Sequence, residues 1–130
     1  MLHFTLEPRN GYLYATVTGE LTVAAAQDGL RDLLGAAARY GQARILIDVS
    51  RLASSEWGPQ ERYEVGAFLA AEQNRIAARF PEEPRVAIYA VAPLMDPNRF
   101  TQRVAVNRGA QVRASDSMHE LLSWLSARQD

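Results

Sequence analysis

The chain has 130 residues, of which 48% are hydrophobic and 22% are charged, and its net charge at pH 7 is −1. These values are typical of one globular domain with its own core, and we expect residues 1–130 to form a single domain. The near-neutral charge excludes recruitment of nucleic acid or of an anionic membrane by bulk electrostatic attraction.

The sequence also bears on cellular location. It contains no cysteine, which excludes disulfides, thiolate metal sites and a thiol nucleophile, and which fits a reducing compartment. The first residues lack the basic flank and long apolar core of a signal peptide, and no apolar run reaches the length of a membrane span. We therefore expect a cytoplasmic protein with no integral membrane segment.

The first predicted elements are two strands joined by a tight turn. Residues 2–7 and 12–18 are extended-looking runs on either side of Asn10-Gly11, the dipeptide that most readily adopts the positive φ angles of a hairpin turn. In the second run apolar and polar residues alternate, as in a strand with one face in water. The domain is expected to open with an antiparallel hairpin near the edge of the sheet.

The remaining chain alternates helices with strands. Four segments combine capping residues, helical spacing of apolar residues and stop signals: residues 22–40, 58–80, 96–109 and 117–125. Unbroken apolar runs at 45–47 and 86–91 predict strands buried on both faces at the middle of a parallel sheet. Val112 and Ala114 predict a brief edge strand. The order is ββαβαβαβα.

This order predicts a single-domain α/β fold whose sheet is mostly parallel, with the N-terminal hairpin as its antiparallel pair. The carboxyl ends of parallel strands meet at one edge of the sheet, where ligands usually bind. We therefore expect binding or regulatory residues in the loops there: Asp48, Ser50, Ser54, Ser55, Trp57, Asp96 and Arg99.

The loop from Asp48 to Gly58 is the richest in polar side chains. Ser54 and Ser55 precede a predicted helix N-terminus, whose free N–H groups favour an anion, so a phosphorylated serine would be stabilised there. The structural alternative is that these serines bond to nearby backbone. Trp57 is likewise either a recognition residue or a lid on the core.

Two aspartates and two arginines also have both a functional and a structural interpretation. Asp48 either contacts a ligand or fixes its loop by accepting backbone hydrogen bonds, and Asp96 is either a catalytic acid or a helix cap. Arg99 and Arg103 lie one helical turn apart, with Arg99 expected in the first turn. They form either a solvated stripe or a contact for an anionic head group or an acidic partner.

The case for an enzyme is thin. The two histidines, His3 and His119, have no plausible nucleophile beside them in sequence, and a triad built from Ser54 and His119 has no motif to support it. Two isolated histidines predict no metal site, and the glycine-rich phosphate-binding loops are absent. We expect no cofactor and no catalytic residue.

Several segments, in this order and spacing, carry a resemblance to a known family. They are Gly11-Tyr12, Gly19 with Thr22, Leu46-Ile47-Asp48-Val49-Ser50, Arg85-Val86-Ala87-Ile88, Asn107-Arg108-Gly109 and Leu121-Leu122-Ser123-Trp124-Leu125. The chain resembles, over nearly its whole length, the STAS-like domains of the bacterial SpoIIAA-like group. These are relatives of the anti-sigma-factor antagonists and, more distantly, of the Sec14 (CRAL-TRIO) lipid carriers.

The resemblance implies a β/α superhelix without a catalytic centre common to the family. In the antagonists, a serine in an Asp-Ser-Ser-Gly motif is phosphorylated by a partner kinase and switches partner binding. Here the strand end matches as Asp48-Val49-Ser50, but Ala53-Ser54-Ser55-Glu56 lacks the Asp and Gly of that motif.

Three hypotheses follow for function. The first is a non-enzymatic binding or regulatory module that acts through the carboxyl-edge loops on a regulatory protein partner or on a small apolar or anionic ligand. The second is a small lipid or apolar-ligand carrier, which should show an apolar cavity beneath residues 59–80, whereas a signalling module should have a filled core and a flat exposed patch. The third is a minor hydrolase. The tyrosines of residues 12–18 also favour a homodimer, if helices leave their face open.

Overall fold

The computed structural model describes residues 2–52, 57–95 and 98–127, and in these it has one five-stranded sheet in the order β1-β2-β3-β4-β5. The strands are β1 (Leu2–Arg9), β2 (Tyr12–Gly19), β3 (Arg44–Asp48), β4 (Arg85–Tyr89) and β5 (Val112–Ser115). The helices are α1 (Val23–Tyr40), α2 (Pro59–Ile76), α3 (Phe100–Asn107) and α4 (Met118–Ser126), and a short 3₁₀ helix, η1 (Ala77–Arg79), follows α2. None of the described helices is long and apolar enough to cross a membrane.

The predicted hairpin and first helix are confirmed. β1 and β2 pair antiparallel from Leu2 opposite Gly19 to Arg9 opposite Tyr12, and Gly11 takes the positive φ (88°) that the turn requires. At the start of α1, Thr22 Oγ1 accepts a hydrogen bond from the backbone N–H of Ala25 at 3.0 Å. At its end Gly41 adopts the left-handed conformation, which is the usual helix stop.

The central strands also lie as predicted. β3 and β4 are parallel neighbours, with Ile45 opposite Val86 and Ile47 opposite Ile88. β2 and β5 flank them, both parallel, so the carboxyl ends of β2 to β5 share one edge of the sheet. β4 begins one residue before the predicted run 86–91 and ends two residues before it does, because the chain leaves the sheet after Tyr89.

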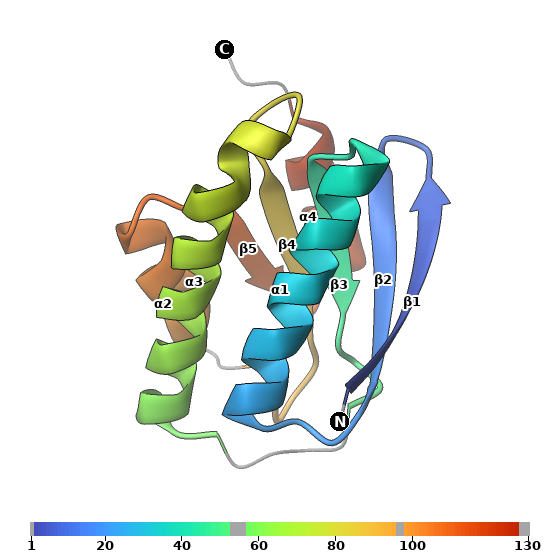
Figure 1. The fold of residues 1–130 in the computed structure, drawn as a ribbon. Coiled ribbons are helices and arrows are strands. Elements are labelled where there is room, and N and C mark those ends of the chain that lie inside the picture. Colours follow the sequence, from blue (N-terminus) through green and yellow to red (C-terminus); the bar gives the residue numbers. More distant parts are fainter. Residues whose placement is uncertain (1, 53–56, 96–97, 128–130) are drawn as a thin grey trace.

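The two faces of the sheet are covered unequally (Figure 1). Helices α1, α2 and α3 pack on one face, over the main core, and α4 packs on the other face. The main core includes Leu13, Leu33, Leu34, Ile45, Leu69, Ile76 and Val86. The smaller cluster beneath α4 is formed by Leu46, Ala87, Leu121 and Leu125.

The predicted start of the third helix is wrong. Asp96 and Pro97 lie outside the described residues, but Asn98 and Arg99 are not helical and α3 begins at Phe100. Arg99 precedes the helix in the left-handed conformation (φ 51°), so it does not stand in the first turn. Its carbonyl still accepts the first helical hydrogen bond, from the N–H of Arg103 at 2.9 Å, and α3 ends at Asn107, two residues before the predicted end at Gly109.

The predicted helix 58–80 is also not continuous. α2 ends at Ile76 and the chain tightens into η1 before Phe80, whose backbone is extended. The tighter turn brings Phe80 into the main core just before Pro81 stops further helix.

Helices α2 and α3 approach each other at Gly66, which generates a prediction. A Cβ atom there would lie 2.6 Å from the carbonyl oxygen of Thr101 and 3.0 Å from Val104 Cβ. Gly66→Ala should therefore lower the free energy of unfolding by about 1–3 kcal/mol, measured by urea denaturation. In the matched control Gly35→Ala, on α1, the new Cβ would make only an ordinary 3.6 Å contact with Arg39. This change should be stabilising by about 0.5–1 kcal/mol, and equal effects at both positions would contradict the close approach.

Candidate functional site

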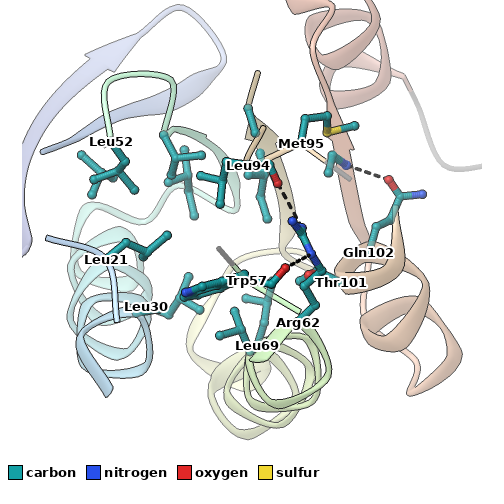
Figure 2. A pocket seen from close by; sticks show the side chains of 18 of the residues that line it. Leu21, Leu30, Leu52, Trp57, Arg62, Leu69, Leu94, Met95, Thr101 and Gln102 are labelled. Carbon is teal, nitrogen blue, oxygen red and sulfur yellow. Dashed lines mark hydrogen bonds between the residues drawn. The ribbon is translucent and has the colours of Figure 1, made fainter. Parts of the chain in front are cut away.

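An apolar cavity lies between the sheet and helices α1, α2 and α3, at the edge where the parallel strands end. Its volume is about 130 Å³. Figure 2 shows side chains from all of these elements converging on it. The lining includes Phe4, Val17, Leu30, Leu33, Ile47, Val49, Leu52, Val65, Leu69, Ile88, Leu94 and Met95.

The cavity exists because small side chains stand where larger ones would fill the space. Ala26 of α1, Ala90 after β4 and Ala114 of β5 all line it. Their positions face the core, and Ala26 and Ala90 are buried. Core packing normally leaves few voids larger than a water molecule, so a hollow of this size is a feature of the fold that needs an explanation.

The mouth of the cavity is formed by side chains that also line an outer groove: Trp57, Arg62, Met95 and Phe100. Arg62 stands in the first turns of α2 and crosses the mouth. Its Nε donates to the carbonyl oxygen of Trp57 at 3.2 Å, and its Nη1 donates to the carbonyl oxygen of Leu94 at 3.0 Å (Figure 2). Arg62 therefore joins the loop before α2 to the loop after β4.

The α3 side of the cavity is polar. Arg99 lines it and pairs with Glu120 of α4 at 3.4 Å, and Arg113 of β5 pairs with the same Glu120 oxygen at 3.4 Å. Burial acts to raise the pKa of Glu120, but the Arg99 charge, a hydrogen bond from Ser115 and Arg113 outweigh it and lower that pKa. Two arginines thus share one carboxylate, which leaves this cluster one positive charge.

Asp48 lies on the opposite face of the sheet. Its Oδ2 accepts a 2.5 Å hydrogen bond from the Tyr14 hydroxyl, and its Oδ1 accepts from the N–H and the hydroxyl of Ser50 at 2.9 and 2.6 Å. Burial acts to raise the pKa of Asp48, but the Ser50 and Tyr14 hydrogen bonds and the nearby Arg51 charge lower it overall. The same hydrogen bond raises the pKa of Tyr14. The carboxylate thereby fixes the loop that follows β3.

The structure therefore divides the predicted site. Trp57 and Arg99 line the cavity, whereas Asp48 and Ser50 form a separate cluster with Tyr14 beneath the sheet. Ser54, Ser55 and Asp96 lie outside the described residues. His3 and His119 are both exposed, and the described residues contain no group of three or more side chains arranged to hold a metal ion.

Arg62 is the residue of this edge that the sequence analysis missed. It stands three residues before Val65 and seven before Leu69, both of which are buried in α2. This spacing places an arginine on the apolar face of an amphipathic helix, which is an available sequence signal. The cavity itself has no such signal, because it depends on how three helices pack.

The comparisons with known proteins bear on this fold. No protein-family model matches the chain, and no curated protein matches it. Among solved structures, the crystal structure of an anti-sigma factor antagonist from Mycobacterium paratuberculosis is similar, with a TM-score of 0.60 and 17% identity over 98% of this chain and 96% of that one. An uncharacterized protein with a SpoIIAA-like fold from Shewanella loihica gives a TM-score of 0.49 and 22% identity over 95% and 93%.

The first of these likenesses shows the fold: the five-stranded α/β architecture of this chain is similar to that of the anti-sigma factor antagonist. The predicted fold class is confirmed.

The Asp48–Tyr14 contact generates a prediction. Tyr14→Phe removes the donor to a buried carboxylate and should lower the free energy of unfolding by about 1–3 kcal/mol at pH 7. Because the pKa of Asp48 is lowered from its ordinary value of 3.8, its stabilising effect is present above that pH and is lost as pH falls through the lowered value. The loss caused by Tyr14→Phe should therefore be constant from pH 5 to 7 and shrink below about pH 4.

Urea denaturation of both proteins across this pH range measures the difference. Tyr40, which is 57% exposed, provides the matched control: Tyr40→Phe should change stability by less than about 0.5 kcal/mol at every pH. A Tyr14→Phe penalty that stays the same at pH 3 would mean that the carboxylate charge does not contribute.

Proposed function

We propose that this domain is a non-enzymatic binding and regulatory module. A small ligand occupies the apolar cavity, and a regulatory protein partner recognises the loops at the same edge of the sheet. The similar structure from Mycobacterium paratuberculosis is named as an antagonist of an anti-sigma factor, and that name supports a regulatory role of this general kind. Catalysis is not part of the proposal.

The observation that carries the proposal is the cavity of about 130 Å³ beneath α2. An engineered cavity of roughly 150 Å³ lined by Leu, Ile and Phe is known to stay dry and to bind benzene. The present cavity has nearly this size and a similar lining. Its natural occupant should therefore have a compact apolar body of about that volume.

The position of the cavity supports a regulatory role for its occupant. Leu52, Trp57, Leu94 and Met95 belong to the loops that leave β3 and β4, and all of them line the cavity. A ligand inside would contact the inner side of the same loops whose outer side a partner would meet. Binding inside and recognition outside would then affect each other.

A small-ligand carrier is the second candidate, and the same cavity favours it, since the carrier hypothesis predicted an apolar space beneath residues 59–80. The filled core expected of a signalling module was a wrong prediction, so the module proposed above includes a ligand in the cavity. The volume restricts the cargo, because a pocket for a drug-sized or larger molecule usually takes about 300–1,000 Å³. A whole phospholipid is therefore too large for the cavity as described. A carrier can bind its ligand without any change in the loops, whereas the regulatory module requires the loops to change when ligand binds. This difference separates the two candidates.

Fluorobenzene tests ligand binding and loop response together. The chain should show saturable binding by ¹⁹F NMR, and the bound protein should show slower amide hydrogen exchange in residues 49–52 and 92–95. Ala26→Leu, which fills the cavity from α1, should abolish binding. Ala24→Leu, at an exposed position of the same helix, should leave it unchanged.

The outcomes separate the candidates. Binding without any change in hydrogen exchange would favour the carrier over the regulatory module. Absence of saturable binding, or equal binding by Ala26→Leu and Ala24→Leu, would contradict both.

A further inference from the structure

We infer that the ligand of the cavity is a small carboxylate with a compact apolar body, and that Arg62 binds its carboxylate group. This inference rests on the proposed function, because it assumes that the cavity is a binding site, and it adds the chemical class of the ligand. The observations that carry it are the position of Arg62 at the mouth, its hydrogen bonds to two loop carbonyl oxygens, and the positive charge that Arg62 and Arg99 bring to the lining.

Arg62 is placed where an anionic head group would have to lie. It lines both the interior cavity and the outer groove, so its guanidinium stands at the boundary between them. A ligand with its apolar body inside would leave a polar end at this boundary. Figure 2 shows the guanidinium of Arg62 held there by its contacts with Trp57 and Leu94.

The guanidinium of Arg62 has more donors than its contacts with described residues use. An arginine has five N–H groups, and those of Nε and Nη1 reach the two carbonyl oxygens. Within the described residues Nη2 has no protein acceptor and no carboxylate forms an ion pair with Arg62, although its side chain is half-buried. A half-buried guanidinium is stabilised by an anionic acceptor, and a ligand carboxylate would supply one.

A second cationic side chain, Arg99, adds to the positive charge of Arg62 at the cavity. Arg99 lines the α3 side and shares Glu120 with Arg113, so this cluster retains a positive charge. No acidic residue of the described chain lines the cavity or the groove. The positive charges of Arg62 and Arg99 in this lining favour an anion over a cationic ligand of the same shape.

The interior restricts the rest of the ligand. Apart from the polar side chains at the mouth and on α3, the lining consists of apolar residues, and the volume admits a body about the size of benzene. Aromatic and short aliphatic monocarboxylates meet both conditions. Phenylacetate is a suitable probe, because its ring matches the cavity and one methylene separates the ring from the charge.

Three probes of nearly equal shape test the inference on the intact chain by isothermal titration calorimetry: phenylacetate, 2-phenylethanol and phenethylammonium. Phenylacetate should bind at least about tenfold more tightly than the alcohol, because its carboxylate forms a charge-assisted hydrogen bond with Arg62 where the alcohol forms a weaker, neutral one. Phenethylammonium should bind most weakly. This comparison needs no variant, so it holds even where a substitution at Arg62 impairs folding.

Variants assign the effect to Arg62. Arg62→Met keeps the apolar stem and should remove most of the preference for phenylacetate over the alcohol, whereas Arg62→Lys should retain part of it. Arg103→Met is the matched control, because Arg103 lines the groove but not the cavity, and it should retain the preference. Circular dichroism melts establish that each variant is folded.

The outcomes distinguish this inference from the proposed function. If 2-phenylethanol and phenylacetate bind equally, or if Arg62→Met keeps the full preference, the cavity is a binding site but the carboxylate inference is overturned. If none of the three probes binds, both the inference and the proposed binding function are overturned.

Discussion

The structure depends on one constraint, which is that strands β2 to β5 follow each other in the sheet in chain order and run parallel. Right-handed crossovers between neighbouring parallel strands then place every connecting helix on the same face. Helices α1, α2 and α3 must share that face, and only the C-terminal helix α4 remains for the other. The same constraint brings the carboxyl ends of these strands, and the loops that follow them, to one edge.

The sheet consequently separates two polar clusters that lie at that edge. Asp48 alternates with Ile47 along β3, so its carboxylate points to the α4 face, where Tyr14 and Ser50 saturate it with hydrogen bonds. Arg62 lies on the helical face, where it holds two loops by their carbonyl oxygens, and among the described residues its Nη2 has no acceptor. The first cluster stabilises a loop and has little capacity left for a ligand, whereas the second has that capacity.

Much of this fold could be predicted because its signals are local. Thr22, Gly41 and Asn10-Gly11 specify caps and a turn through their own backbone preferences, and the apolar runs of β3 and β4 require burial on both faces. The start of α3 could not be predicted, because Arg99 adopts a left-handed conformation that is sterically unfavourable for a residue with a Cβ atom. In this conformation Arg99 forms an ion pair with Glu120 of α4, a residue distant in sequence. The cavity could not be predicted either, since Ala26, Ala90 and Ala114 come together only through helix packing.

The contacts of Arg62 also explain how an empty and an occupied cavity can differ at the surface. The guanidinium holds the carbonyl oxygens of Trp57 and Leu94, which belong to two separate loops. A carboxylate at this guanidinium would compete with those oxygens or draw the group toward itself, because a charged acceptor forms a stronger hydrogen bond than a neutral carbonyl. Either change alters both loops at once. A single side chain at the mouth can therefore couple occupancy inside the domain to the shape of the edge that a partner meets, and by linkage the partner would alter ligand affinity by the same factor.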